Sequence, residues 1–154
     1  MITFAISSIF ERDLKGFIEE LNLYKTEEDI WKVPQGVLNS GGNLCLHICG
    51  NLNHFIGAVL GNTGYIRNRD KEFSTKHTPR AELIKEVESA IKTVSETLKK
   101  LSDDDLKKEY ASLPVQLTSG KEKWTVAHFL LHLIAHMDYH HGQMNYHRRL
   151  VHNG

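Results

Sequence analysis

The sequence lacks an excess of either charge, a long apolar run and a Cys-x-x-Cys pair. Lys plus Arg and Asp plus Glu number 19 each, so the formal net charge is zero with histidine neutral. No basic surface for nucleic acid is therefore predicted. No stretch approaches the roughly 20 apolar residues of a membrane-spanning helix, and we expect no membrane partner. The only cysteines, Cys45 and Cys49, are expected to be buried, reduced thiols rather than zinc ligands.

The N-terminus also lacks the features of a secretory signal. Residues 1–10 carry no basic residue, and Glu11, Arg12 and Asp13 follow too early for an apolar signal segment. A cytoplasmic protein is expected. With 154 residues and no internal repeat, we expect one domain that spans residues 1–154.

Apolar residues recur at helical spacing through most of the chain. A first helix is predicted to end near Asn22, and a second to span Asn43–Leu60, with Asn39 or Ser40 as its N-cap and Gly61 after its end.

A third helix is predicted from Thr78 and Pro79. Its apolar stripe comprises Leu83, Val87, Ile91, Val94, Leu98 and Leu101. A capping box of Ser102 and Asp105 predicts a minor helix through Tyr110, and an extended stretch is expected at Val115–Thr118. The last helix is predicted from Thr125 to Val151.

Four long helices favour an all-α fold, an antiparallel four-helix bundle with a long connection between the second and third helices. That connection is rich in charge and too polar for a core strand. It is either a solvated loop, or Arg67 or Arg69 pairs with Glu72 or the last helix, or reaches an anionic substrate. The sequence leaves these alternatives open.

Ten histidines are unusual for this length, and four stand at every fourth position of the last predicted helix: His128, His132, His136 and His140. Residues four apart on a helix have Cβ atoms roughly 5–6 Å apart, so two neighbouring imidazoles can share one metal ion. Each step of four also rotates by about 40°, which prevents all four from converging. Any further ligand must come from another helix.

The second helix carries His47 and His54 on its buried face. The last helix carries His136, His140, Gln143 and His147 on one stripe, which can face the bundle interior. His54 and His147 are either hydrogen-bonded core residues or line a pocket beside a metal ion. Gln143 either orients a ligand or holds the helix packing, and Asn51 has the same two alternatives. No Asp or Glu lies on the stripe of His136 and His140.

The run His136-Met-Asp-Tyr-His140-His-Gly-Gln143 resembles the HxxxHxGQ signature of the DinB-like superfamily of metal-binding four-helix bundles. The segments GGNLCLHICGNLNHFI and GYIRNRDKEF resemble its second helix and its middle. The resemblance implies three metal ligands, His47, His136 and His140, and no ligand role for His54. At Tyr139 and His141 many relatives have other residues.

The resemblance also implies a reaction class, because superfamily members include thiol S-transferases. Three neutral imidazoles leave a coordination position open for water or a substrate thiolate, so S-transfer and hydrolysis are both predicted. Zinc or nickel is the expected ion, and a small molecule, for example a low-molecular-weight thiol, is the expected partner. The alternative is a non-enzymatic metal- or ligand-binding stress-response bundle. A homodimer is equally compatible with the apolar stripe of residues 83–101.

Overall fold

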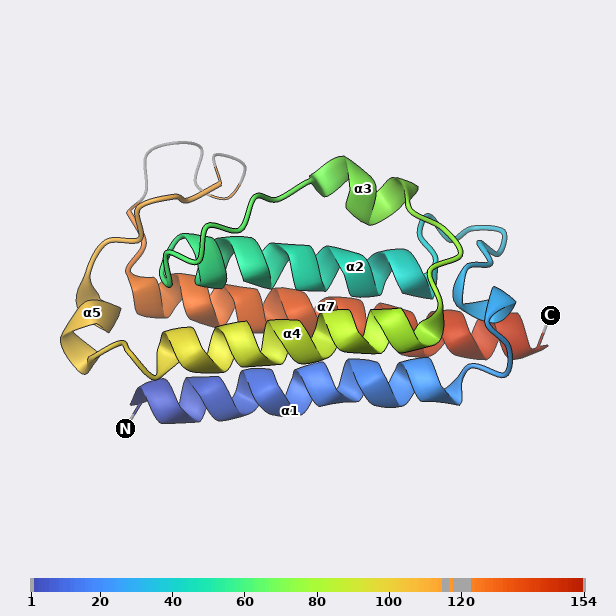
Figure 1. The fold of residues 1–154 in the computed structure, drawn as a ribbon, viewed down its shortest axis with the longest axis horizontal. Helices are drawn as coiled ribbons and strands as arrows, with labels where there is room; N and C mark the ends of the chain where they lie inside the picture. Colours follow the sequence, from blue (N-terminus) through green and yellow to red (C-terminus); the bar gives the residue numbers. More distant parts are fainter. Residues whose placement is uncertain (1, 115–116, 118–122, 154) are drawn as a thin grey trace.

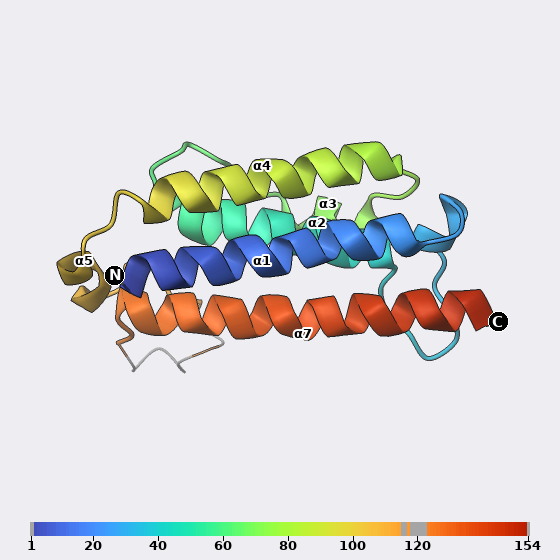
Figure 2. The same cartoon turned by 90° about the horizontal axis from the view of Figure 1, so that it is seen from below.

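A computed structural model of the chain describes residues 2–114, 117 and 123–153. Four long helices lie side by side (Figures 1 and 2). They are α1 (Ile2–Leu23), α2 (Gly41–Leu52), α4 (Arg80–Leu98) and α7 (Val126–Asn153). Across the described residues there is no strand, and the one β-bridge joins Glu109 and Thr125. The predicted all-α class is confirmed.

The four helices do not alternate in direction along the chain. The colours in Figure 1 show α1 and α7 running one way and α2 and α4 running the other. Because α1 contacts α4 and α7, and α2 also contacts α4 and α7, each helix has one parallel and one antiparallel neighbour. A uniformly antiparallel bundle, as predicted from the sequence, therefore does not describe this packing. Helical periodicity carries no information about direction, and the long connection permits α2 and α4 to run parallel.

The connection between α2 and α4 returns along the length of the bundle (Figure 1). It contains a short helix, α3 (Arg69–Ser74), that the sequence analysis did not predict and that lies over α2. The Asn68 side chain caps α3 by accepting a hydrogen bond from the Lys71 amide at 3.1 Å. Asn43 of α2 donates from Nδ2 to the carbonyls of Glu72 and Thr75, both at 2.9 Å. These two bonds fasten α3 to the first turn of α2.

The second helix changes its hydrogen-bonding pattern part-way. It begins after Ser40, whose side chain accepts from the Asn43 amide as one of the two predicted N-caps, and it continues beyond Leu52 as a π-helix, Asn53–Ala58. The predicted end at Gly61 is close, but the left-handed backbone that closes the segment belongs to Asn62, with φ of 50°. A Cβ at Gly61 would instead collide with the Thr97 hydroxyl, so glycine there permits close packing on α4.

The remaining helix ends lie near their predicted positions. Pro79 caps α4, and the Ser102–Asp105 capping box opens a minor helix, α5 (Asp103–Lys107), which is shorter than predicted. The expected extended stretch at 115–118 lies outside the described residues except for Leu117.

The core lies between the four long helices. Fully buried side chains include Phe10, Leu14 and Phe17 of α1, Leu83 and Val87 of α4, and Phe129 and Leu130 of α7. Cys45 and Cys49 are buried and free, as expected. In the described part of the chain, no helix combines the length and apolar character needed to cross a bilayer.

Candidate metal centre

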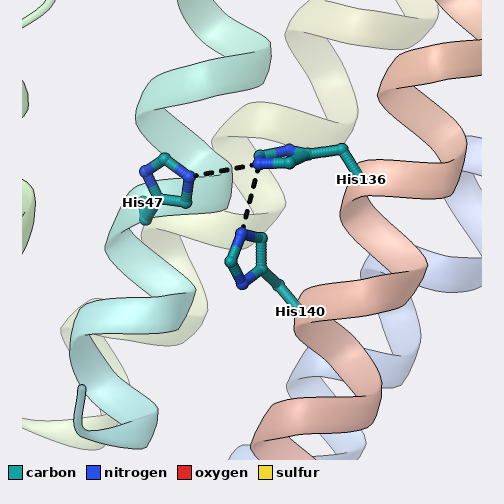
Figure 3. A group of neighbouring side chains, drawn as sticks. All are labelled: His47, His136 and His140. Atoms are coloured by element: carbon teal, nitrogen blue, oxygen red, sulfur yellow. Dashed lines mark hydrogen bonds between the residues drawn. The ribbon is translucent and has the colours of Figure 1, made fainter. Parts of the chain in front are cut away.

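Three histidines from two helices converge at one point between α2 and α7. His47 projects from α2, and His136 and His140 project from successive turns of α7 (Figure 3). The Nε2 atom of His136 lies 3.4 Å from Nε2 of His47 and 3.1 Å from Nε2 of His140. The ligand nitrogens of all three residues lie within 4.8 Å of one another. The structure thus brings together the three residues that the family resemblance implied.

These separations fit coordination of one divalent ion. Metal–nitrogen bonds of about 2.0–2.1 Å at tetrahedral angles place the ligand nitrogens about 3.3 Å apart. The two measured Nε2 separations, 3.1 and 3.4 Å, lie on either side of that value. The spacing of His136 from each of its two neighbours therefore suits one ion, and the ligand nitrogens of His47 and His140 lie within 4.8 Å of each other.

The hydrogen-bond partners of His47 and His140 orient the two rings so that the Nε2 lone pairs face the centre of the cluster. Nδ1 of His47 lies 2.9 Å from Oε2 of Glu72, and Nδ1 of His140 lies 2.7 Å from Oε1 of Gln143. Because both partner oxygens are acceptors, we assign the proton of each neutral ring to Nδ1, which leaves Nε2 with a free lone pair. This tautomer can bind a metal ion through Nε2, and the partner holds the ring orientation.

His136 is the least satisfied of the three. Its Nδ1 atom is buried and has no hydrogen-bond partner among the described residues, and the same is true of Oδ1 of Asn51. Asn51 lies one turn beyond His47 on α2, while His136 lies one turn before His140 on the antiparallel α7. Nδ1 of His136 can donate a hydrogen bond and Oδ1 of Asn51 can accept one. Both atoms lie at the same end of the site.

Burial also keeps the rings of His136 and His140 neutral. Burial, with the nearby His140 and His47, lowers the pKa of His136 to about 3. Burial likewise lowers the pKa of His140, against the opposing effect of its hydrogen bond to Gln143. Neutral imidazole is the form that coordinates a metal ion, so the site is prepared for binding at neutral pH.

Glu72 of α3 belongs to the site through a buried ion pair. Arg67 donates from Nε to Oε1 of Glu72 at 2.7 Å and from Nη2 to Oε2 at 2.9 Å. Burial alone would raise the pKa of Glu72, but the hydrogen bonds from His47 and Arg67 together lower it. Glu72 is therefore a carboxylate whose two oxygens are both occupied. Of the alternatives for the connection, pairing of Arg67 with Glu72 is confirmed.

The contact of Glu72 with His47 was not predicted from the sequence, although one signal was present. Gly50 follows His47 by three residues, and a Cβ at position 50 would collide with the Glu72 carboxylate. Only a residue without a side chain leaves room for the Glu72 carboxylate at this position against α2. A glycine one turn from a candidate ligand can therefore indicate that another segment packs there.

The other histidines lie outside the cluster. His147 is buried, with Nδ1 2.6 Å from the Tyr24 hydroxyl and Nε2 2.8 Å from the Lys32 carbonyl, so it is a hydrogen-bonded core residue. His54 lies on the π-helix, half-buried, with its ring centroid 4.7 Å from that of Phe55.

Of the four histidines spaced by four on α7, the first two, His128 and His132, contact Trp124. Trp124 stacks on His128 with ring centroids 4.0 Å apart, and it contacts His132 edge to face at 5.5 Å. Of these four histidines, only His136 and His140 therefore belong to the candidate metal-binding cluster.

A family model described as "Protein of unknown function (DUF1572)" matches residues 10–154. The chain belongs to the DUF1572 family. Among solved structures, this DUF1572 protein is similar to one described as "Crystal structure of the conserved protein of locus from Enterococcus faecalis". The two are 16% identical, with a TM-score of 0.78 over 100% of this chain and 99% of the other, which shows a shared fold. None of the curated proteins matches the chain.

Proposed function

We propose that this DUF1572 protein binds a divalent metal ion as a member of the DinB-like class, with His47, His136 and His140 as its ligands. One observation carries the proposal: three Nε2 atoms from α2 and α7 converge at 3.1 and 3.4 Å, while Glu72 and Gln143 hold two of the rings from behind. Zinc or nickel is the proposed ion, since both suit imidazole ligands.

The proposed activity is metal-dependent catalysis on a small molecule, either S-transfer from a low-molecular-weight thiol or hydrolysis. When bound, the ion would act as a Lewis acid that lowers the pKa of a thiol or water in its open position. The protein's own contribution is positional. Glu72 and Gln143 fix the ring orientation of His47 and His140, and burial keeps the rings of His136 and His140 neutral.

The second candidate is a non-enzymatic metal- or ligand-binding stress-response bundle. Glu72 is the carboxylate that contacts the candidate ligand His47. Both of its oxygens already accept hydrogen bonds, from His47 and Arg67, and this favours the second candidate. Such a carboxylate is not free to take a proton from a substrate. Under this alternative the ion is stored or sensed, and no turnover of substrate is expected.

Metal analysis of untagged protein tests the proposal first. After supplementation with zinc or nickel and removal of free ion, we expect about one ion per chain by mass spectrometry. The triple variant His47→Gln, His136→Gln, His140→Gln should lose it, whereas His128→Gln with His132→Gln should retain it. Wild-type protein without bound ion, or a triple variant that binds as well as wild type, would refute the metal site.

Activity measurements then separate the two candidates. Metal-loaded protein is assayed with low-molecular-weight thiols plus an electrophile, and with ester and amide substrates. Turnover that requires both the ion and the three histidines supports the enzyme and distinguishes transferase from hydrolase. Stoichiometric ion binding without turnover across both panels favours the non-enzymatic alternative. Cytoplasmic location and a homodimer remain predictions.

A further inference from the structure

A cavity of about 320 Å³ lies one helical turn from the histidine cluster. It is lined by residues 36–39 of the loop before α2, by Leu44 of α2, and by Gln143, Tyr146, His147 and Leu150 of α7. Leu44 precedes His47 by three residues, and Gln143 follows His140 by three. Because α2 and α7 run antiparallel, both steps lead toward the same end of the seam between them. We call this cavity the seam pocket.

Gln143 connects the seam pocket with the candidate metal centre. Its side chain lines the pocket, and its Oε1 atom lies 2.7 Å from Nδ1 of His140. A molecule in the pocket therefore touches the residue that orients one of the proposed ligands. The distance along each helix, about one turn or 5.4 Å, is within the length of a small molecule.

The lining of the seam pocket is mostly apolar and carries no charged side chain among the described residues. Five of its residues have apolar or aromatic side chains, and no Asp, Glu, Lys or Arg occurs among the described lining residues. His147 contributes a ring whose two nitrogens already bond to Tyr24 and Lys32, and burial lowers its pKa, so it stays neutral. Arg149 lies outside the lining, with its guanidinium 5.5 Å from the centroid of the Tyr146 ring.

Large apolar side chains at the rim of this pocket are exposed to water. Leu38 is 92% exposed, Tyr146 67% and Leu150 51%. Each would gain free energy by covering an apolar ligand, at about 25 cal/mol per Å² removed from water. A charged group in the same place would lose hydration without meeting a charged side chain of the lining. The volume also lies within the range of small-molecule pockets, about 300–1,000 Å³.

We infer that the seam pocket binds the uncharged, apolar part of a small-molecule substrate whose reactive group reaches the three-histidine site. This inference rests on the proposed function, because it assigns the substrate class of that same site. It selects substrates with a neutral aromatic or aliphatic group over compact anionic ones. Gln143 lies between the pocket that would bind the apolar part of the substrate and the histidines that the reactive group would reach.

The pocket is tested without relying on a metal. The full chain, as purified, is titrated with benzyl alcohol, benzylammonium and benzylsulfonate while backbone amide shifts are followed by NMR. We expect benzyl alcohol to shift the amides of Leu38, Gln143 and Tyr146, and to bind at least tenfold more tightly than either charged probe. Equal affinity for the three probes, or shifts confined to other parts of the chain, would overturn the inference.

A matched pair of variants places the binding in the pocket. Leu150→Asp puts a carboxylate at its rim and should weaken benzyl alcohol binding at least tenfold. Leu131→Asp, on the same helix and 57% exposed but outside the lining, should leave it within twofold. Both positions are exposed, and thermal denaturation checks that both variants fold. Equal effects of the two substitutions would contradict binding in the pocket.

A third measurement tests the link to the metal centre. Zinc-loaded protein is titrated with benzyl thiol and with 2-mercaptoethanesulfonate, which share a sulfur ligand but differ in their tails. We expect an at least tenfold preference for benzyl thiol that Leu150→Asp abolishes. No such preference would overturn the link to the metal site. A chain that binds benzyl alcohol in the pocket but binds no ion would instead refute the proposed function and leave pocket binding established.

Discussion

At the scale of single residues, the site depends on side chains that hydrogen-bond to the Nδ1 atoms of the histidines. Glu72 contacts His47 on one side and Arg67 on the other, and all three side chains are largely buried, with at most 12% exposed. Removing one partner of a buried charged pair leaves the other uncompensated. The orientation of His47 is therefore tied to the ionised state of Glu72.

Replacing Glu72 by glutamine should weaken metal binding about 10- to 100-fold, as is typical when a partner of a metal-binding histidine is altered. The amide can still accept a hydrogen bond from His47 but no longer carries the charge that pairs with Arg67. Zinc affinity is measured by competition with a chelating dye. The control is Asp70→Asn, an exposed residue on the same short helix. Equal zinc affinity in wild type and Glu72→Gln would show that Glu72 does not support the site.

At this scale the sequence grouped the three histidines and offered Gln143 as a residue that orients a ligand, but it did not indicate Glu72 as the partner of His47. Helical spacing made His136 and His140 neighbours, and the family resemblance supplied His47. Glu72 is 25 residues from His47 along the chain and reaches it only because α3 docks on α2. Periodicity describes the faces of one helix, so a contact made by docking of a separate segment leaves no trace in it.

At the scale of helices and loops, two glycines near the site have opposite roles. A Cβ at Gly50 would displace the Glu72 carboxylate, whereas a Cβ at Gly142 would meet no atom within 4 Å. Gly142 belongs to the signature that carries the family resemblance, yet local packing does not require it.

We expect Gly50→Ala to lower both zinc affinity and melting temperature, because α3 must move away from α2. Gly142→Ala should leave zinc affinity unchanged and stabilise the protein by about 0.5–1 kcal/mol, since alanine is the better helix former. Zinc titration and chemical denaturation of the two variants provide the comparison. A Gly50→Ala protein with normal affinity would mean that Glu72 adjusts without leaving His47.

A side-chain hydrogen bond connects the π-helix that follows α2 to the segment after α5. Tyr110 donates from its hydroxyl to the Phe55 carbonyl at 2.7 Å. Tyr110→Phe should therefore reduce the free energy of unfolding by about 1 kcal/mol, the typical net value of one hydrogen bond. Urea denaturation measures the difference. Unchanged stability would show that water replaces the hydroxyl at this carbonyl.

Helix starts were easier to predict than helix ends or irregular turns. Ser40, Pro79 and the Ser102–Asp105 box act through side chains or ring geometry that the sequence displays directly. The change to π-helix at Asn53 shifts backbone bonding by one residue and has no comparable residue marker.

At the scale of the whole molecule, buried histidines make stability depend on pH. Burial is the largest cause that lowers the pKa of His136, His140 and His147 in the folded protein. Below about pH 6.5 the unfolded chain binds protons at these positions that the folded chain does not. Stability from these groups is thus complete above that pH and is lost as the pH falls. The lowered pKa of Glu72 acts in the same direction at lower pH.

For metal-free protein, the free energy of unfolding should therefore fall between pH 7 and pH 5. Each buried histidine contributes up to about 1.4 kcal/mol per pH unit. Urea denaturation at pH 7, 6 and 5 measures the slope, and His136→Gln should make it shallower. Stability that stayed constant or rose on acidification would contradict this reading of the buried rings.

The path of the chain has a consequence for how an ion would enter and leave. Because α2 and α4 run parallel, the connection must return along the bundle, and it brings Glu72 to the candidate metal centre on a six-residue helix. A helix this short is not stable alone and depends on its docking. Local opening of α3 would free His47 from Glu72 while the four long helices stay folded. The rate of ion release should then rise as the hydrogen-exchange protection of residues 69–74 falls. That rate can therefore change without a change in the global stability of the protein.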